Sequence, residues 1–464
     1  MNAQPSGPAV TRPGTPLSRR VHAGYALGSL VTGAFGTVPG LLLAPYLTDT
    51  LGVAAWLAGV LVWAPKAWDV VVNPFAGRIS DRTRTRWGAR RPYLLVGGLV
   101  LAVLFVAIFA APFGPGGAAG GYVAFAFLLA ATAYAFFQVP YVAMPAELTD
   151  SYTERTRLLT WRIAVLAVAI LVSGAVAPIV VDAGGDGVPG HRWMGVFVGV
   201  LIVAGTVGVF LGTAGAPTGT VVESEPSLKA QLAVASRNRP FRLLLICFVI
   251  QAVGIAMILA GVKYFADHVL FEPDAGPTFL FACFVGPALL VMPLWSRAGG
   301  RLGKARAFVL ASVLFGVGAL LLALAPVLPA VAVYVLVGVM GVAYAGQQVF
   351  GLAMLPDCIA YDTARTGRRQ AGVFTGLWTA GETFGLALGP GLYLLVLEIF
   401  GYVSSSSGTA AVQDDTARLG VLLGFTVVPG LIVALAALLM RGYDLTEARL
   451  AQAGPEPLPA GAVN

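Results

Sequence analysis

Long apolar segments recur along the whole chain and are separated by short polar turns. Each has about twenty or more residues, so a helix made from it can cross a hydrocarbon layer of about 30 Å. The segments are residues 23–48, 53–79, 93–112, 120–146, 159–181, 194–214, 240–267, 277–296, 306–325, 329–356, 371–399 and 419–440. The pattern predicts an all-α membrane protein with twelve transmembrane helices, of which 306–325 and 329–356 are only weakly separated.

Composition agrees with this pattern. Hydrophobic residues make up 58% of the 464 residues and charged residues only 11%, whereas soluble domains carry about 25% charged residues. The net charge of +7 comes largely from arginines in short loops, where basic residues set membrane topology, and we therefore expect no nucleic-acid partner. The three cysteines have no metal-ligand spacing and are expected to pack in the core.

The loops alternate in charge along the chain. The basic loops lie at 78–91, 155–162, 237–242, 297–306 and 365–369, and the acidic loops at Asp49, Asp182, Asp186, Glu272, Asp274, Asp414 and Asp415. Because basic loops stay on the cytoplasmic side, both termini are predicted to be cytoplasmic. The protein is then a multi-pass protein of the cytoplasmic membrane, with the lipid bilayer as its surroundings.

The two halves of the chain echo each other. The fourth apolar segment closes with 143–147 (AMPAE) and the tenth with 353–357 (AMLPD). This repeat predicts an N-terminal six-helix bundle at 19–214 and a C-terminal one at 240–441, joined by a cytoplasmic loop at 215–239. Residues 1–18 and 442–464 are then cytoplasmic tails, the first of them disordered. Two repeats with a site between them are transporter architecture.

One carboxylate lies deep in an apolar segment. Asp69 precedes Asp81 by 12 residues, which places it roughly 18 Å from the basic loop along a helix. Lys66, Asp69 and Asn73 share one helix face. A charge at that depth is costly and indicates a functional site, although an internal ion pair between Asp69 and Lys66 or Arg162 would also explain it.

Several blocks resemble a known family. They are 68–77 (WDVVVNPFAG), 81–92 (DRTRTRWGARRP), 145–155 (PAELTDSYTER), 357–369 (DCIAYDTARTGRR) and 443–447 (YDLTE). These blocks resemble the glycoside–pentoside–hexuronide:cation symporters, the melibiose permease-like branch of the major facilitator superfamily. The resemblance implies two six-helix bundles, alternating access and cation-coupled solute uptake across the cytoplasmic membrane.

The resemblance also suggests a coupling site. Asp69 matches the first of two family acids that bind the coupling cation, but Asn73 stands where the second acid is expected. Sodium could still be held by Asp69, the Asn73 carbonyl oxygen and a hydroxyl. Glu382 occupies a position where the melibiose permease has a lysine, so the sign is reversed. Glu382 is therefore either a proton carrier or an acid that balances Lys66 or Arg162. No cofactor is expected beyond H⁺ or Na⁺, and no metal other than sodium at Asp69.

Candidate substrate-binding residues are Lys66, Gln138, Arg162, Gln251 and Trp378. Gln138 and Gly33 stand where family members have sugar-binding acids, so galactoside specificity does not carry over. Amides, including Gln347 and Gln348, can still bind sugar hydroxyls. Each residue also has a structural interpretation: an interhelical hydrogen bond for Gln138, an extension towards the cytoplasm for Arg162, and packing for Trp378.

Charged residues at the predicted cytoplasmic ends form a candidate gate. They are Asp81, Arg82, Arg86, Arg91, Glu147 and Asp357, with Glu154 nearby. We expect them to form ion pairs that hold the outward-facing state and break on inward opening. The alternative is that they only set topology.

The favoured function is cation-coupled symport of a small polar organic solute, most simply a sugar or glycoside, by a monomer. Transport of an amphiphile such as a lysophospholipid, or uncoupled facilitation, are alternatives. A channel fits the repeated gate loops poorly. An enzyme is disfavoured because the sequence has no nucleotide-binding loop and only three histidines, His22, His191 and His268.

Overall fold

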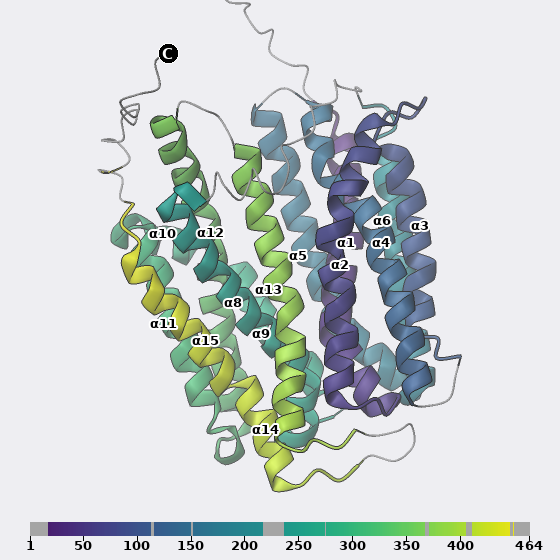
Figure 1. The fold of residues 1–464 in the computed structure, drawn as a ribbon, viewed down its shortest axis with the longest axis vertical. Coiled ribbons are helices and arrows are strands. Elements are labelled where there is room, and N and C mark those ends of the chain that lie inside the picture. Colours follow the sequence, from purple (N-terminus) through teal and green to yellow (C-terminus); the bar gives the residue numbers. More distant parts are fainter. Residues whose placement is uncertain are drawn as a thin grey trace, which may run out of the picture.

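The computed structural model describes residues 17–112, 116–149, 152–216, 236–273, 275–366, 371–404, 411–445 and 449. These residues are mostly helical, and the long helices run nearly parallel to one another (Figure 1). The predicted tails 1–18 and 442–464 and the central loop 215–239 fall largely outside the described residues.

The first half of the chain supplies six long helices: α1 (Arg19–Val38), α2 (Ala55–Arg82), α3 (Arg91–Ile108), α4 (Gly117–Leu148), α5 (Tyr152–Ala183) and α6 (Gly187–Gly212). Two π-helical turns, Pro39–Leu43 and Tyr46–Thr50, extend α1. Within this N-bundle, α1 packs on α5 and α6, and α4 packs on α2 and α3.

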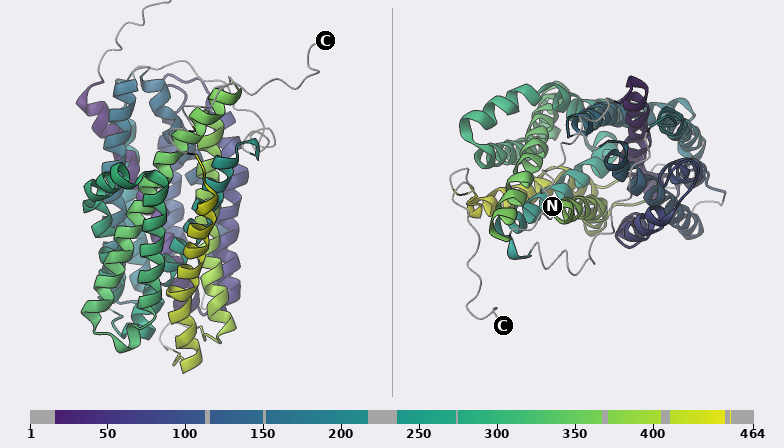
Figure 2. Two further views of the ribbon diagram at one scale, coloured as in Figure 1. Left: turned by 90° about the vertical axis from the view of Figure 1, so that its left-hand side faces the viewer. Right: turned by 90° about the horizontal axis from the view of Figure 1, so that it is seen from above.

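The second half supplies α8 (Arg239–Phe265), α9 (Gly276–Leu290), α10 (Met292–Leu302), α11 (Lys304–Leu322), α12 (Ala330–Thr366), α13 (Ala371–Ile399), α14 (Asp415–Phe425) and α15 (Val427–Leu439). A π-helical turn, Ala266–Leu270, extends α8. Within this C-bundle, α8 packs on α13 and α15, and α12 packs on α9 and α11. The two bundles stand side by side, as the view from above shows (Figure 2).

The helices follow the predicted segments with two interruptions. The predicted 277–296 segment is split into α9 and α10 at Val291, where Pro293 cannot donate a backbone hydrogen bond. The predicted 419–440 segment is split into α14 and α15 at Thr426, three residues before Pro429. The weakly separated pair 306–325 and 329–356 proves to be two helices, α11 and α12.

Ten helices in the described part of the chain are long and apolar enough to cross a membrane. The ten do not include α2, in which the side chains of several residues lie outside the described part of the structure. They also leave out α9, which is too short because of the break at Val291. With these two helices, the twelve predicted segments are accounted for, and the fold is that of an all-α membrane protein.

Glycines allow the closest helix contacts. A methyl group at Gly24 of α1 would collide with the backbone of Gly212 of α6. A methyl group at Gly341 of α12 would collide with the Phe284 carbonyl oxygen of α9. Close approach through small residues is how helices associate in lipid, where no hydrophobic effect drives them together.

The bundles are joined by hydrogen bonds at one end. The Tyr402 hydroxyl donates to Asp49 Oδ1 at 2.9 Å, and the hydroxyls of Thr48 and Tyr264 lie 2.6 Å apart. We call this the acidic end, because the loops with Asp49, Asp186, Asp414 and Asp415 lie there; it is at the bottom of Figure 1. The opposite end, with the loops at 78–91 and 297–306, is the basic end. Since basic loops face the cytoplasm, the structure is closed on the outer side.

Other contacts strengthen this closure. The Ser404 hydroxyl donates to the Val53 carbonyl oxygen at 2.8 Å, and the Trp56 amide donates to Glu398 Oε2 at 3.3 Å. The helix pairs α2–α13 and α5–α9 form the apolar part of the same boundary. A transporter in this conformation has its two halves held together on the outer side.

Candidate functional site

Asp69 is buried on α2, a helix that packs at the boundary between the bundles. Its helix, α2, packs on α4 of its own bundle and on α13 of the other. The residue is 6% exposed, so its charge is held away from bulk water. The side chains of Asp69 and of Arg162 on α5 both lie close enough to the Tyr134 hydroxyl of α4 to interact with it electrostatically. The structure thus groups an acid, a phenol and a guanidinium from three helices of the N-bundle.

Asn73 follows Asp69 by one helical turn and is partly exposed. Val72 and Ala76 of the same helix pack against Ala135 of α4 in a small apolar cluster. The described residues contain no group of three or more His, Cys, Asp or Glu that could hold a metal ion. The side chains of Lys66, Asp81 and Glu147 lie outside the described part of the structure, and their roles stay predictions.

Arg162 lies in a polar network that the sequence did not predict. Its guanidinium carbon is 5.2 Å from the centre of the Tyr141 ring. The Tyr141 hydroxyl donates to the Tyr25 carbonyl oxygen at 2.8 Å, and the Ser29 hydroxyl donates to the Arg162 carbonyl oxygen at 3.0 Å. Gly28 makes room for the Tyr141 ring, because a methyl group there would collide with it. The network holds Arg162 between α1, α4 and α5, and its only sequence signal was a row of small and hydroxyl residues on α1.

The C-bundle presents a second acid. Glu382 on α13 lies near the Gln348 amide of α12, and Gln348 Nε2 donates to the Tyr344 hydroxyl at 3.0 Å. Glu382 is partly buried. Its amide neighbour Gln348 is neutral, so this contact brings no counter-charge to Glu382.

Several buried polar atoms have no hydrogen-bond partner among the described residues. They include the side-chain oxygens of Gln138 and Gln251, both polar atoms of the Gln347 amide, and Trp378 Nε1. Buried polar groups in proteins are nearly always hydrogen-bonded, so these atoms are candidates for bonds to water or to a solute. Gln251 already uses its Nε2 to donate to the Ser312 hydroxyl at 2.7 Å. Trp378 stacks on Phe248 at 4.0 Å between ring centres, so one face of its indole is used for packing.

Three of the candidate gate residues, Arg86, Arg91 and Asp357, make contacts within their own bundles in this conformation. Asp357 pairs with Lys304 at 2.7 Å inside the C-bundle. Arg91 donates from Nη2 to the Phe210 carbonyl oxygen at 2.7 Å inside the N-bundle. Arg86 lies over the Trp87 ring, and Arg82 is exposed. Glu154 accepts from the Leu17 amide at 3.1 Å. The proposed latch between bundles therefore remains a prediction about another conformation.

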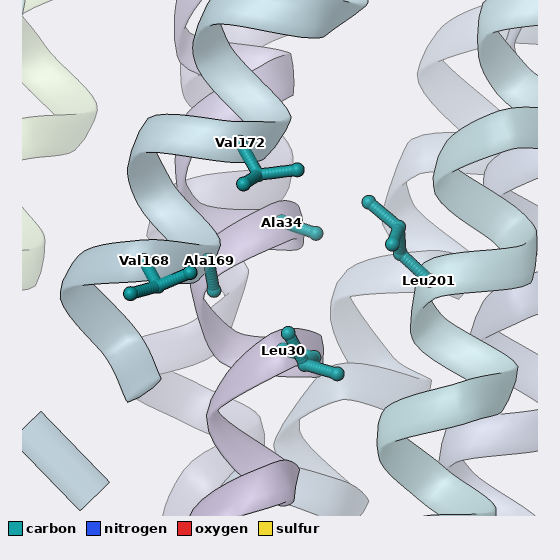
Figure 3. A pocket seen from close by; sticks show the side chains of 6 residues that line it. All are labelled: Leu30, Ala34, Val168, Ala169, Val172 and Leu201. Atoms are coloured by element: carbon teal, nitrogen blue, oxygen red, sulfur yellow. The ribbon is translucent and has the colours of Figure 1, made fainter. Parts of the chain in front are cut away.

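One small cavity is lined entirely by hydrocarbon. Leu30 and Ala34 of α1, Val168, Ala169 and Val172 of α5, and Leu201 of α6 surround about 50 Å³ (Figure 3). The lining offers no hydrogen bond, so this cavity does not suit a polar solute. It lies inside the N-bundle and does not include Asp69 or Glu382.

Taken together, two bundles of membrane-spanning helices, closed at one end and carrying acids along their boundary, define a membrane transporter. The comparison with family models is decisive: the chain belongs to the MFS/sugar transport protein family, whose model matches residues 24–447. The protein is thus a multi-pass membrane transporter of small molecules and not an enzyme.

Curated relatives and solved structures agree with this assignment. The chain is 28% identical over 447 residues to the putative glycoside/cation symporter YagG of Escherichia coli, covering 94% of each protein. It is 25% identical over 438 residues to the glucuronide carrier protein homolog of the same organism, covering 93% of each. The crystal structure of the nucleoside transporter NupG superimposes with a TM-score of 0.64 at 14% identity, over 92% of this chain and 100% of that one; at this identity the likeness shows the fold alone.

Proposed function

We propose that the protein is a cation-coupled symporter that carries a glycoside or a glycosiduronic acid by alternating access. The observation that carries the proposal is the position of Asp69: a buried acid on α2, the helix that contacts both its own bundle and α13 of the other. Similarity to a glycoside/cation symporter and to a glucuronide carrier homolog supports the same substrate class. We also propose that one chain suffices, because both bundles are supplied by it.

The coupling follows from the cost of an ionised acid in a low-dielectric boundary. A cation bound at Asp69 neutralises the charge, so α2 can remain packed against α13 while the bundles rock. Without the cation, the charged carboxylate favours a conformation in which water reaches it. Na⁺ would use Asp69 and the Asn73 carbonyl oxygen, whereas H⁺ would use Asp69 or Glu382.

Solute recognition is assigned to groups on both sides of the boundary. Amides such as Gln138 and Gln347 both donate and accept, as sugar hydroxyls require. Arg162, whose planar guanidinium can bind a carboxylate through two parallel hydrogen bonds, suits the acidic group of a glucuronide. Trp378 and Gln251 belong to the C-bundle half of this site.

The experiment is a thermal-unfolding panel on the purified protein with methyl glucosides, methyl glucuronides and lysophosphatidylcholine, each with and without Na⁺ and at two pH values. Stabilisation by a sugar that needs Na⁺ or acid and is lost in Asp69→Asn supports the proposal. Stabilisation by the lysolipid alone would replace the sugar by an amphiphile. Sugar stabilisation that is indifferent to both ions would indicate uncoupled facilitation.

A further inference from the structure

Asp49 lies at the outer boundary of the bundles and belongs to neither the coupling site nor the gate predicted from the sequence. It is in the π-helical turn Tyr46–Thr50, which follows the first membrane-spanning segment, Arg19–Leu43. The carboxylate is partly buried, and it meets the C-bundle through the 2.9 Å hydrogen bond that Tyr402 donates to its Oδ1. An acid is therefore part of the contact that closes the protein on its outer side.

The hydrogen bonds at Asp49 leave one of its oxygens available. The Thr48 hydroxyl also donates to Oδ1, at 2.9 Å, so both donors converge on the same atom. Oδ2 accepts no hydrogen bond from the described residues. A proton can therefore bind at Oδ2 without disturbing either bond, and the partial exposure of Asp49 gives it access from the outer solution.

The partners of Asp49 extend the contact across the boundary. His268 Nε2 lies 3.0 Å from the Tyr402 hydroxyl. Because that hydroxyl donates its proton to Asp49, His268 is the donor in this bond. On the other side of Asp49, Thr48 is bonded to Tyr264 of α8. In the described part of the chain, part of the outer closure is thus a continuous row of hydrogen bonds from His268 through Tyr402, Asp49 and Thr48 to Tyr264, and Asp49 is the carboxylate in that row.

Other charged and titratable groups face this turn. They are Lys263, Tyr264, Asp267 and His268 from α8 and its π-helical extension, Tyr393 and Tyr402 from α13 and the residues after it, and His191 and Arg192 from α6. Lys263 and Asp267 form an ion pair at 3.2 Å, so their charges largely cancel at Asp49.

We propose that Asp49 is a proton-binding site of the outer closure, through which the pH of the outer solution sets the balance between the outer-closed and outer-open conformations. The proposal rests on the bundle contact and holds whichever solute the protein carries. Proton binding removes a carboxylate charge that closure would otherwise desolvate, so acid favours closure.

The sign follows from linkage. Burial raises the pKa of Asp49 to about 7, with the Asp267 charge adding to the rise and the bonds from Tyr402 and Thr48 and the Lys263 charge opposing it. In the outer-open conformation the carboxylate is hydrated and its pKa returns to about 4. Between these two values the closed state binds a proton that the open state does not, so the closed-to-open ratio rises about tenfold for each unit of falling pH. Above both values the ratio no longer depends on this group.

The test is a distance measurement between spin labels at Ala118→Cys and Val327→Cys, in a background without the native cysteines. Both sites are exposed, and they lie at the acidic end of different bundles. In nanodiscs, the labelled protein with Asp49 intact should show two label-to-label distances, and the population with the longer one should disappear as pH falls from about 8 to about 5. This change corresponds to roughly a hundredfold gain in the closed-to-open ratio. Asp49→Asn, which mimics the protonated state, should be closed at both pH values.

Two further variants make the test decisive. His268→Gln should keep the pH response; if it abolishes the response while Asp49→Asn keeps it, the histidine is the proton site and the proposal is wrong. Tyr402→Phe removes a hydrogen-bond donor that stabilises the ionised carboxylate of Asp49. The midpoint of the pH-dependent distance change should therefore move to higher pH in this variant. This result can be obtained even if Asp49→Asn does not fold. The proposal would be overturned if the midpoint of the distance change were the same in Tyr402→Phe as in the protein with Tyr402, or if the distance distribution of the protein with Asp49 intact did not change with pH.

Discussion

Gly59 of α2 and Gly391 of α13 face each other across the bundle boundary with no side chain between them. A methyl group added at Gly59 would lie 3.5 Å from both the Cα atom and the carbonyl oxygen of Gly391, which is ordinary van der Waals contact. The two backbones are thus as close as they can be while leaving room for one methyl group. This contact lies towards the outer side of the same helix that carries Asp69.

Gly59→Leu should therefore weaken the outer closure, whereas Gly59→Ala should be tolerated. Overpacking of this kind costs about 1–3 kcal/mol, enough to shift the closed-to-open ratio by about fivefold or more. The Ala118–Val327 spin-label pair should show a longer distance in the leucine variant only. Equal distance distributions in both variants would show that the boundary is not close-packed at Gly59.

Asp357→Asn should reduce transport more than it reduces stability. The Lys304–Asp357 pair is partly exposed, with side chains 40% and 29% accessible, so its loss should cost less than about 1 kcal/mol of unfolding free energy. If Asp357 also closes the basic end in the other conformation, uptake should fall by about fivefold or more. Lys304→Met is the matched control, since it breaks the same pair but keeps the acid. Equal uptake in the two variants would remove Asp357 from the gate.

Arg162→Lys should separate acidic from neutral sugars. Lysine keeps the charge but not the planar pair of donors. Because hydrogen bonds to charged groups contribute about 1.5–3 kcal/mol, the concentration of methyl glucuronide needed for the same thermal stabilisation should rise by about tenfold or more. Stabilisation by a methyl glucoside should be nearly unchanged. Tyr141→Phe, which loosens the network around Arg162, should give a smaller effect in the same direction. A variant that binds both sugars normally would place Arg162 outside the substrate site.

Glu382→Gln should identify the coupling ion. If Glu382 carries a proton, uptake driven by a pH gradient should be lost, while solute exchange without a gradient continues. Gln348→Leu is the comparison variant: it removes the amide next to Glu382 but keeps the acid titratable, so its uptake should still follow the pH gradient even if solute binding weakens. Uptake by Glu382→Gln that still follows the pH gradient would indicate that the coupling proton binds at Asp69 instead.

The sequence predicted the fold well, because hydrophobic segments of membrane length can form little else than spanning helices. It also placed Asp69 on α2 and Glu382 on α13, since the cost of intramembrane charge makes such residues conspicuous. The helix breaks at Val291 and Thr426 were missed, because prolines in spanning helices are often tolerated and only packing decides which of them interrupt a helix.

The sites that depend on contacts between distant segments could not be read from the sequence. Tyr141, Tyr25 and Ser29 surround Arg162 only because α1, α4 and α5 meet, and none of the three is unusual within its own segment. Asp49 looked like a loop charge that sets topology. Its bond to Tyr402 joins residues 353 positions apart, and only the folded chain shows that this acid lies on the boundary between the bundles.

If a cation bound at Asp69 drives solute movement, the protein should accumulate its solute against a gradient, and concentrative uptake measures this. Proteoliposomes holding the wild-type protein or Asp69→Asn would receive a mixture of methyl glucosides and methyl glucuronides, with an imposed Na⁺ or H⁺ gradient, and their contents would be measured by mass spectrometry. We predict that the wild type accumulates at least one of these sugars above its external concentration only when one of the gradients is present, and that Asp69→Asn exchanges the same sugar without accumulating it. Equal accumulation by the two proteins, or none by the wild type under either gradient, would contradict the account.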